Sequence, residues 1–126
     1  MMQPKVLIVD DQEMIRKLVK MTLSSHNFDI LEAKNGAEGL QTVKSHRPDV
    51  VILDVMMPGE FDGIQVCKKI REIPGCEQTV ILMLSAKTQK IDKEEGIDAG
   101  ATDYLYKPFS PEYLLLQINH YLSEIK

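Results

Sequence analysis

The sequence predicts a single α/β domain over residues 1–126, with a five-stranded parallel sheet, helices on both faces and a doubly wound (βα)5 arrangement. Short runs rich in Val, Ile, Leu and Met alternate with segments whose apolar residues recur at helical spacing. The alternation repeats five times with short connections, which is typical of parallel strands joined by right-handed crossovers. A chain of 126 residues is long enough to close one core.

The strands are predicted from runs of apolar residues bounded by polar ones. We expect them at residues 5–10, 28–33, 49–54, 79–85 and 103–107. All but the second are dominated by Val, Ile, Leu, Met or Tyr, as in strands that are buried on both faces. The second alternates between apolar and polar residues, which favours a place at the edge of the sheet.

Three- and four-residue spacings of apolar side chains predict the helices between these strands. The first three helix faces consist of Ile15, Leu18, Val19, Thr22 and Leu23; of Ala37, Leu40, Val43 and Lys44; and of Ile64, Cys67, Ile70 and Arg71. The fourth helix, at about residues 89–99, is charged and weakly apolar.

The fifth helix is predicted by its start signal and its apolar stripe. Ser110 supplies a capping hydroxyl, Pro111 suits the first helical position, and Glu112 lies near the positive end of the helix dipole. The stripe consists of Leu115, Ile118, Leu122 and Ile125, widened by Leu114 and Tyr121. Tyr113 and Leu116 fall outside it, so we expect them to face away from the sheet.

Composition limits the class of function. The net charge is −4 and no block of Lys or Arg occurs, which argues against direct nucleic-acid binding. Apolar runs such as residues 80–84 are too short to cross a membrane, and no secretory signal is visible. Cys67 and Cys76 form no C-x-x-C pair, so we expect reduced thiols in a cytoplasmic protein, with a disulfide as the alternative.

Polar residues stand where the predicted strands end. Asp10-Asp11, Asp54, Ser85 and Lys107 occupy the carboxyl ends of four strands, the edge at which such folds bind ligands. Nearby carboxylates cannot all stay ionised without a counter-charge, and Mg²⁺ is a cation that prefers oxygen ligands. The sequence therefore predicts a magnesium site. For Asp10-Asp11 taken alone, capping of the next helix is the alternative interpretation.

The same residues suit phosphoryl transfer. Asp54 ends the buried run VVILD and precedes a sharp turn, where its carboxylate can act as a nucleophile toward phosphorus. A hydroxyl such as that of Ser85 can hydrogen-bond a phosphoryl oxygen, and an ammonium such as that of Lys107 can pair with another. Phosphoryl transfer depends mainly on such positioning and charge neutralisation.

The chain resembles a receiver domain of a two-component response regulator, of the chemotaxis-regulator kind, over nearly all of residues 4–125. The resemblance implies the flavodoxin-like strand order 2-1-3-4-5 and a regulatory switch rather than an enzyme. It is carried by VLIVDD at 6–11, PDVVILDVMMPG at 48–59, DG at 62–63, LSAK at 84–87, GIDAGATDYLYKPF at 96–109 and SPEYLL at 110–115.

The resemblance implies a role for each residue at the strand ends. Asp54 would receive a phosphoryl group from the phosphohistidine of a sensor histidine kinase or phosphotransfer protein. Mg²⁺ would be bound by Asp11, Asp54 and the main-chain carbonyl of Met56, with Asp10 assisting through water. Ser85 and Lys107 would hold the phosphoryl group, Tyr104 would turn inward as an aromatic switch, and the peptide bond between Lys107 and Pro108 would be cis.

Two features near Asp54 bear on these expectations. The family usually has one residue between the glycine of this loop and the DG pair, whereas this chain has Glu60 and Phe61. Met56 and Lys87 occupy positions that flank the phosphoryl group in the family and control the access of water. We therefore expect the apolar Met56 to slow hydrolysis of the phosphorylated form.

Downstream function follows from the last elements. In the family, the face made by helix four, strand five and helix five often binds partner proteins, and here it includes Tyr113 and Leu116. Receivers that pair through this face for DNA binding have arginines in the fifth helix, and residues 110–126 contain none. We therefore expect a monomer or weak dimer that contacts neither nucleic acid nor membrane; the downstream target is unknown.

Two other functions stay open. An aspartate-nucleophile phosphohydrolase would be an enzyme on a similar sheet, but that class has a D-x-D motif that neither VDDQE nor LDVMM supplies. A degenerate receiver that binds partners without phosphorylation is the other alternative, although all of the key residues are present.

Overall fold

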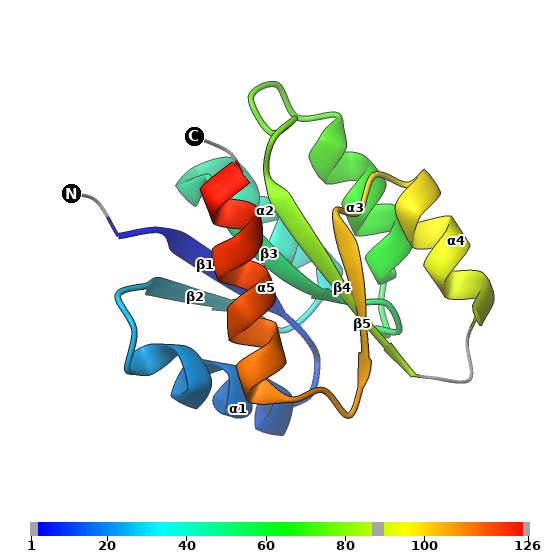
Figure 1. Ribbon diagram of the computed structural model, residues 1–126. Coiled ribbons are helices and arrows are strands. Elements are labelled where there is room, and N and C mark those ends of the chain that lie inside the picture. The colour runs from blue at the N-terminus through cyan, green and yellow to red at the C-terminus, as the bar shows by residue number, and fades with distance from the viewer. Residues whose placement is uncertain (1–2, 87–89, 125–126) are drawn as a thin grey trace.

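The computed structural model describes residues 3–86 and 90–124 and contains one five-stranded parallel sheet (Figure 1). The order of the strands is β2-β1-β3-β4-β5, which confirms the predicted order and the edge position of the second strand. The strands are β1 (Lys5–Val9), β2 (Asp29–Ala33), β3 (Val50–Asp54), β4 (Val80–Ala86) and β5 (Asp103–Lys107). The helices are α1 (Glu13–Ser24), α2 (Gly36–His46), α3 (Gly63–Arg71), α4 (Lys90–Asp98) and α5 (Pro111–Glu124).

The predicted element bounds differ from these by at most one residue for the strands. The largest consequence is at Asp10, which was expected within the first strand and lies just after it. Its N–H still donates to the Ala33 carbonyl at 3.1 Å, but its side chain turns the backbone by accepting a hydrogen bond from the Gln12 N–H at 2.9 Å. The strand therefore ends at Asp10, because the next hydrogen bond of the backbone goes to the Asp10 side chain and not to a neighbouring strand.

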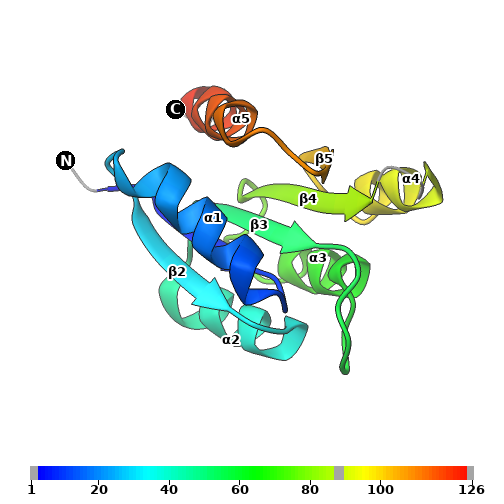
Figure 2. The same ribbon diagram turned by 90° about the horizontal axis from the view of Figure 1, so that it is seen from below.

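The helices form a layer on each side of the sheet, as expected (Figure 2). Helices α1 and α5 pack on one face, and α2, α3 and α4 lie on the other. Alternate residues of each strand face the two layers. In β1, Val6 and Ile8 join the core under α1 and α5, whereas Leu7 and Val9 join the core under α2 and α3. Burial on both faces explains why the inner strands are almost wholly apolar.

Helix α5 has the predicted orientation. Leu114 and Ile118 are fully buried, whereas Tyr113 and Leu116 are 47% and 65% exposed. The Ser110 hydroxyl accepts a hydrogen bond from the Tyr113 N–H at 3.3 Å, which confirms Ser110 as the capping residue. Ile125 lies outside the described residues.

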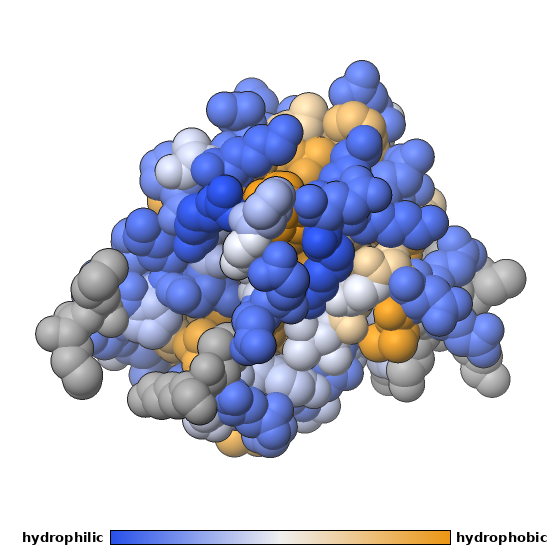
Figure 3. Space-filling view, turned by 90° about the horizontal axis from the view of Figure 1, so that it is seen from above, coloured by the Kyte–Doolittle hydropathy of each residue, from blue (hydrophilic) through white to orange (hydrophobic). Residues whose placement is uncertain are grey.

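Figure 3 shows the face of the molecule that is seen from above the view of Figure 1. Hydrophilic residues cover most of it and hydrophobic areas are confined to smaller spots between them (Figure 3). Within the described ranges, no helix combines the length and apolar character that a membrane span needs. The edge of the sheet where the strands end holds the polar residues that the sequence singled out.

Candidate functional site

Three carboxylates lie together at the carboxyl ends of β1 and β3. Oxygen atoms of Asp10, Asp11 and Asp54 lie within 4.8 Å of one another, as the sequence predicted. Asp10 is fully buried, Asp54 is 4% exposed, and Asp11 is exposed to solvent. The order of the strands reverses at β1, so this is the switch point at which doubly wound sheets bind ligands.

Helix capping does not explain the acidic pair. The residue that caps α1 is Gln12, and its side chain makes no capping hydrogen bond. Asp10 instead holds the Gln12 N–H, which turns the chain from the strand toward the helix. The two acids therefore belong to the strand end rather than to the helix terminus.

Lys107 supplies the cation of the cluster. It comes from the end of β5, which is separated from β3 by β4. Its Nζ atom lies 3.2 Å from Oδ1 of Asp54 and 3.5 Å from Oδ2 of Asp10. One ammonium cannot balance three carboxylates, so the cluster keeps a strong attraction for a further positive charge. The peptide bond that follows Lys107 is cis, as predicted.

The pKa values of the buried acids reflect this imbalance. Burial, together with the nearby charge of Asp10, raises the pKa of Asp54 to about 6 against the opposing effect of Lys107. Burial also raises the pKa of Asp10, although the Gln12 N–H and Lys107 oppose that change. A proton or a metal ion beside either carboxylate would therefore stabilise the folded protein. At neutral pH most Asp54 side chains are ionised, because this pH lies above their pKa.

The donor set fits a divalent cation. All three acids offer carboxylate oxygens, which are the ligands that Mg²⁺ prefers. Oδ2 of Asp10 is buried, and among the described residues it accepts no hydrogen bond of good geometry, although the Lys107 ammonium lies 3.5 Å from it. An acceptor in this position suits an ion or an ordered water at the cluster.

Ser85 and Tyr104 lie on the strands beside the cluster. Ser85 is 2% exposed and follows Leu84, the residue that pairs with Asp54 across β3 and β4. The Tyr104 side chain is buried and its ring packs against α4. The contact is close, because a Cβ added to Gly96 of α4 would lie 3.0 Å from the ring. The ring therefore already points inward in this structure, and its predicted rotation stays a prediction.

The loop after β3 places Met56 and accommodates the additional residue. The Met56 N–H points at Oδ1 of Asp54, 3.4 Å away, and its side chain is 60% exposed. Gly59 adopts a φ of +112° and Phe61 returns to pack against the core, with the Lys69 ammonium 5.0 Å from its ring centroid. The loop thus turns at Gly59 and returns to the core at Phe61. Lys87 lies outside the described residues.

Gly63 determines how closely α3 approaches the site. A Cβ at this position would lie 2.2 Å from the Asp54 carbonyl oxygen and 2.7 Å from the Val55 Cα. The Gly63 N–H donates to the Val55 carbonyl at 2.9 Å. Only a residue without a side chain permits this approach of backbone to backbone.

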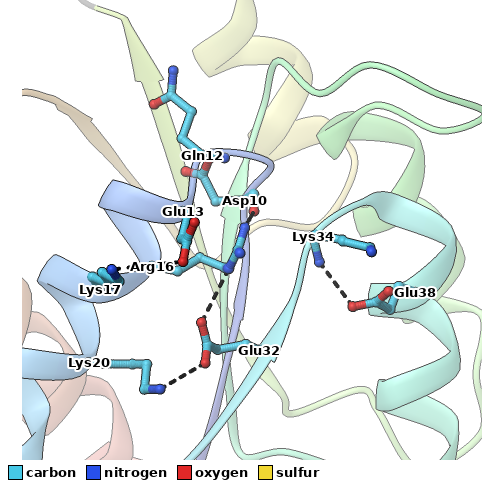
Figure 4. Close-up of polar contacts among 9 residues, drawn as sticks. All are labelled: Asp10, Gln12, Glu13, Arg16, Lys17, Lys20, Glu32, Lys34 and Glu38. Carbon is cyan, nitrogen blue, oxygen red and sulfur yellow. Dashed lines mark hydrogen bonds and ion pairs between the residues drawn. The ribbon is translucent and has the colours of Figure 1, made fainter.

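Arg16 was not predicted as part of the site. It lies in the first turns of α1 and its NH1 group donates to the main-chain carbonyl of Asp10 at 2.7 Å (Figure 4). The sequence offers one weak signal, because Arg16 is the first basic residue after the acidic pair. Nothing in the spacing shows that its partner is a main-chain atom.

A doubly wound parallel sheet with an acidic, lysine-containing pocket at its switch point defines a class of α/β ligand-binding domains, and the comparisons give the family within it. Residues 6–119 match the model of the response regulator receiver domain. The chain belongs to this family of two-component response regulators.

The relatives agree on this assignment. The chain is 44% identical over 117 residues to the transcriptional regulatory protein SrrA of Staphylococcus aureus, covering 93% of this chain and 47% of SrrA. It thus spans about half the length of the curated relatives it matches. The chemotaxis response regulator CheY4 of Vibrio cholerae has a similar structure, with a TM-score of 0.88 and 38% identity over 95% of this chain and 99% of that one. The BeF3-activated DrrB receiver domain has a TM-score of 0.86 at 31% identity, with 97% and 99% coverage.

Proposed function

We propose that Asp54 accepts a phosphoryl group from the phosphohistidine of a sensor histidine kinase or a phosphotransfer protein. The observation that supports this most strongly is the buried Asp54 carboxylate, 3.2 Å from the Lys107 ammonium and grouped with two further acids. In the transfer, a P–O bond to Asp54 forms as the P–N bond breaks, and the electron pair of that bond returns to the imidazole ring.

Each neighbour of Asp54 has a role in this proposal. Asp11, Asp54 and the main-chain carbonyl of Met56 would hold Mg²⁺, with Asp10 acting through water. When bound, the ion neutralises carboxylate and phosphoryl charge. Lys107 pairs with a phosphoryl oxygen. Its ion pairs with Asp10 and Asp54 support this role, because they hold its ammonium beside the acceptor carboxylate. Ser85, at the end of β4, donates a hydrogen bond to another phosphoryl oxygen.

Incubation with acetyl phosphate and Mg²⁺ tests the proposal. We expect the intact mass to rise by one phosphoryl group, and the rise to be absent in Asp54→Asn, which keeps the size of the side chain but removes the nucleophile. An unchanged mass of the parent protein, or an equal rise in Asp54→Asn, would contradict the assignment of Asp54.

The output of the domain is a change in protein binding rather than a chemical product. The surface made by α4, β5 and α5 contains the exposed side chains of Ile97, Tyr113 and Leu116, which are 45%, 47% and 65% exposed. Tyr104 on β5 lies beneath α4 and would couple this surface to Ser85 and the phosphoryl group. The partner is a downstream protein, and the domain acts as a monomer or weak dimer without direct contact to nucleic acid or membrane.

Two measurements test the output. Beryllofluoride with Mg²⁺ mimics a phosphoryl group, and we expect amide NMR signals of α4, β5 and α5 to shift on its addition. Signal changes confined to residues that touch Asp54 would argue for a domain without this output. Size-exclusion chromatography with and without the mimic measures assembly, and a stable dimer in either state would contradict the monomer or weak-dimer proposal.

A phosphohydrolase is the alternative enzyme for this pocket. The two functions differ in the fate of the acyl phosphate, because the switch retains it on Asp54 whereas the enzyme turns over many phosphoesters. Steady release of inorganic phosphate from an aryl phosphate would favour the enzyme.

Cys67 and Cys76 are both free thiols, which supports our proposal of a cytoplasmic location.

A further inference from the structure

Arg16 joins α1 to the strand end that bears the acidic pair. Its NH1 group donates to the Asp10 carbonyl at 2.7 Å, and its Nε group donates to Oε1 of Glu32 at 3.2 Å. Lys20, one turn further along α1, holds the other oxygen of Glu32 at 2.9 Å (Figure 4). The Arg16 side chain is only 15% exposed, so the guanidinium is held within the fold rather than extended into solvent.

The bond to the Asp10 carbonyl has a geometric consequence for Asp11. The carbonyl of Asp10 and the N and Cα atoms of Asp11 share one rigid peptide plane. Ala33 holds the Asp10 N–H at 3.1 Å, and Arg16 holds the Asp10 carbonyl. With both groups fixed, the direction in which the Asp11 side chain leaves the backbone is restricted, although that side chain is itself exposed.

We propose that Arg16 is a positioning residue, which orients the Asp10–Asp11 peptide so that Asp11 presents its carboxylate to the divalent cation. This inference rests on the proposed function, because it gives Asp11 a metal to bind. Glu32 contributes by fixing the guanidinium, since charge-assisted hydrogen bonds define its direction.

The sign of the effect on metal binding separates positioning from simple electrostatics. Arg16 is a cation close to an acidic cluster, so the loss of its charge alone should strengthen the binding of a second cation. The loss of its bond to Asp10 should weaken binding, because the ligands are no longer held in place. The two explanations therefore predict opposite changes in the dissociation constant of Mg²⁺.

The experiment compares Arg16→Met with Lys20→Met by calorimetric titration of Mg²⁺ into the metal-free protein. Both substitutions keep an unbranched apolar stem and remove one positive charge from the same network. Only Arg16→Met also removes the bond to the Asp10 carbonyl. NMR spectra of the metal-free variants give a second measurement through the amide signal of Asp11, and unfolding in urea shows whether each variant remains folded.

We expect Arg16→Met to bind Mg²⁺ about tenfold more weakly, a typical effect of losing a residue that orients a metal ligand. Lys20→Met should bind it about as tightly as the parent, because an exposed ion pair contributes little. The Asp11 amide signal should move in Arg16→Met and stay in place in Lys20→Met.

Three results would overturn the inference. Unchanged or tighter Mg²⁺ binding by a folded Arg16→Met would show that the guanidinium acts only through its charge. Equal weakening in both variants would assign the effect to the network as a whole and not to the Asp10 contact. If the parent itself binds no Mg²⁺ at millimolar concentration, the proposed metal site fails together with the inference, which distinguishes that failure from the other two.

Discussion

At the scale of single residues, the behaviour of the domain depends on two buried carboxylates. Asp10 and Asp54 are almost inaccessible to solvent, yet within the described part of the chain only the Lys107 ammonium forms ion pairs with both. Burial of an ionised group without full compensation costs free energy, and the raised pKa values of both acids express that cost. The site thus trades stability of the metal-free protein for affinity toward a cation.

Neutralising Asp54 should stabilise the metal-free protein at neutral pH. The pKa of Asp54 is about 6 in the folded chain against 3.8 for the free group, so the folded state binds the proton more tightly. Between about pH 4 and pH 6 stability therefore falls as pH rises. We expect Asp54→Asn to unfold with a free energy about 1–3 kcal/mol higher at pH 7 in EDTA, and to lack this fall.

Urea unfolding of both proteins at pH 4, 5, 6 and 7 checks this prediction. The comparison of the two proteins at each pH isolates the contribution of Asp54 from those of other acids. Equal stability of the two proteins at pH 7, or a gap that is widest at pH 4, would show that Asp54 is not strained when ionised.

Met56 should control the lifetime of the phosphorylated form. Its exposed apolar side chain lies two positions beyond Asp54 and offers no hydrogen bond to an attacking water. An amide in this place can orient that water. We expect Met56→Asn to lose the phosphoryl group faster than the parent, as measured by the decay of the phosphorylated mass after removal of the donor. A Met56→Leu control should decay at the parental rate, and equal rates for all three proteins would refute the idea.

Lys107 and Arg16 differ in whether their place in the site could be predicted from the sequence. Lys107 was predicted because it ends a strand, and strand ends of a parallel sheet converge whatever the details of packing. Arg16 was missed because it acts through a main-chain carbonyl, and a carbonyl has no residue type to be recognised. Side chains at element ends are thus predictable, whereas contacts from a helix surface to a backbone atom are not.

At the scale of elements, the β3–α3 connection links Asp54 to the start of α3. Helix α3 begins with a capping box in which Asp62 and Gln65 each accept the other's backbone N–H. The loop before this start turns at Gly59, which has a φ of +112°. The start of α3 is therefore fixed from both sides, by its cap and by the contact of Gly63 with the end of β3.

Gly63→Ala should destabilise the domain and displace Asp54. The added methyl group would meet backbone atoms of Asp54 and Val55 that cannot move without shifting β3. Overpacking of this kind costs about 1–3 kcal/mol or more. Gly39→Ala is a matched control on α2, because its neighbours are Val9 methyl groups at 3.0 Å. Urea unfolding should show a larger loss for Gly63→Ala, and equal losses would mean that the close approach does not constrain the site.

The bounds of the strands were predictable to about one residue because burial on both faces leaves a clear apolar signal. Helix α4, predicted at about 89–99, covers Lys90–Asp98 and was found from position rather than from a strong pattern. The orientation of the Tyr104 ring could not be predicted, since it depends on the space that Gly96 leaves in α4. Such packing details arise from pairs of elements and not from either segment alone.

At the scale of the whole molecule, the acidic cluster lies at the edge of the sheet where the strands end, and the proposed binding surface of α4, β5 and α5 lies beside the last strand. Asp10, Asp11 and Asp54 come from adjacent strands, whereas Lys107 reaches them from β5, the strand that also bears Tyr104. A change at the acidic cluster therefore acts directly on the strand that borders α4 and α5. We propose that this arrangement lets the domain convert one added charge into a change of its binding surface.

The central claim is that Asp54 is phosphorylated in a pocket whose repulsion a divalent cation relieves. The most direct measurement is the mass of the parent protein after acetyl phosphate, with Mg²⁺ in one sample and EDTA in the other, followed by borohydride trapping to locate the modified residue. We expect one added phosphoryl group on Asp54 with Mg²⁺ and almost none with EDTA. A phosphoryl group on another residue, or equal phosphorylation in both samples, would contradict it.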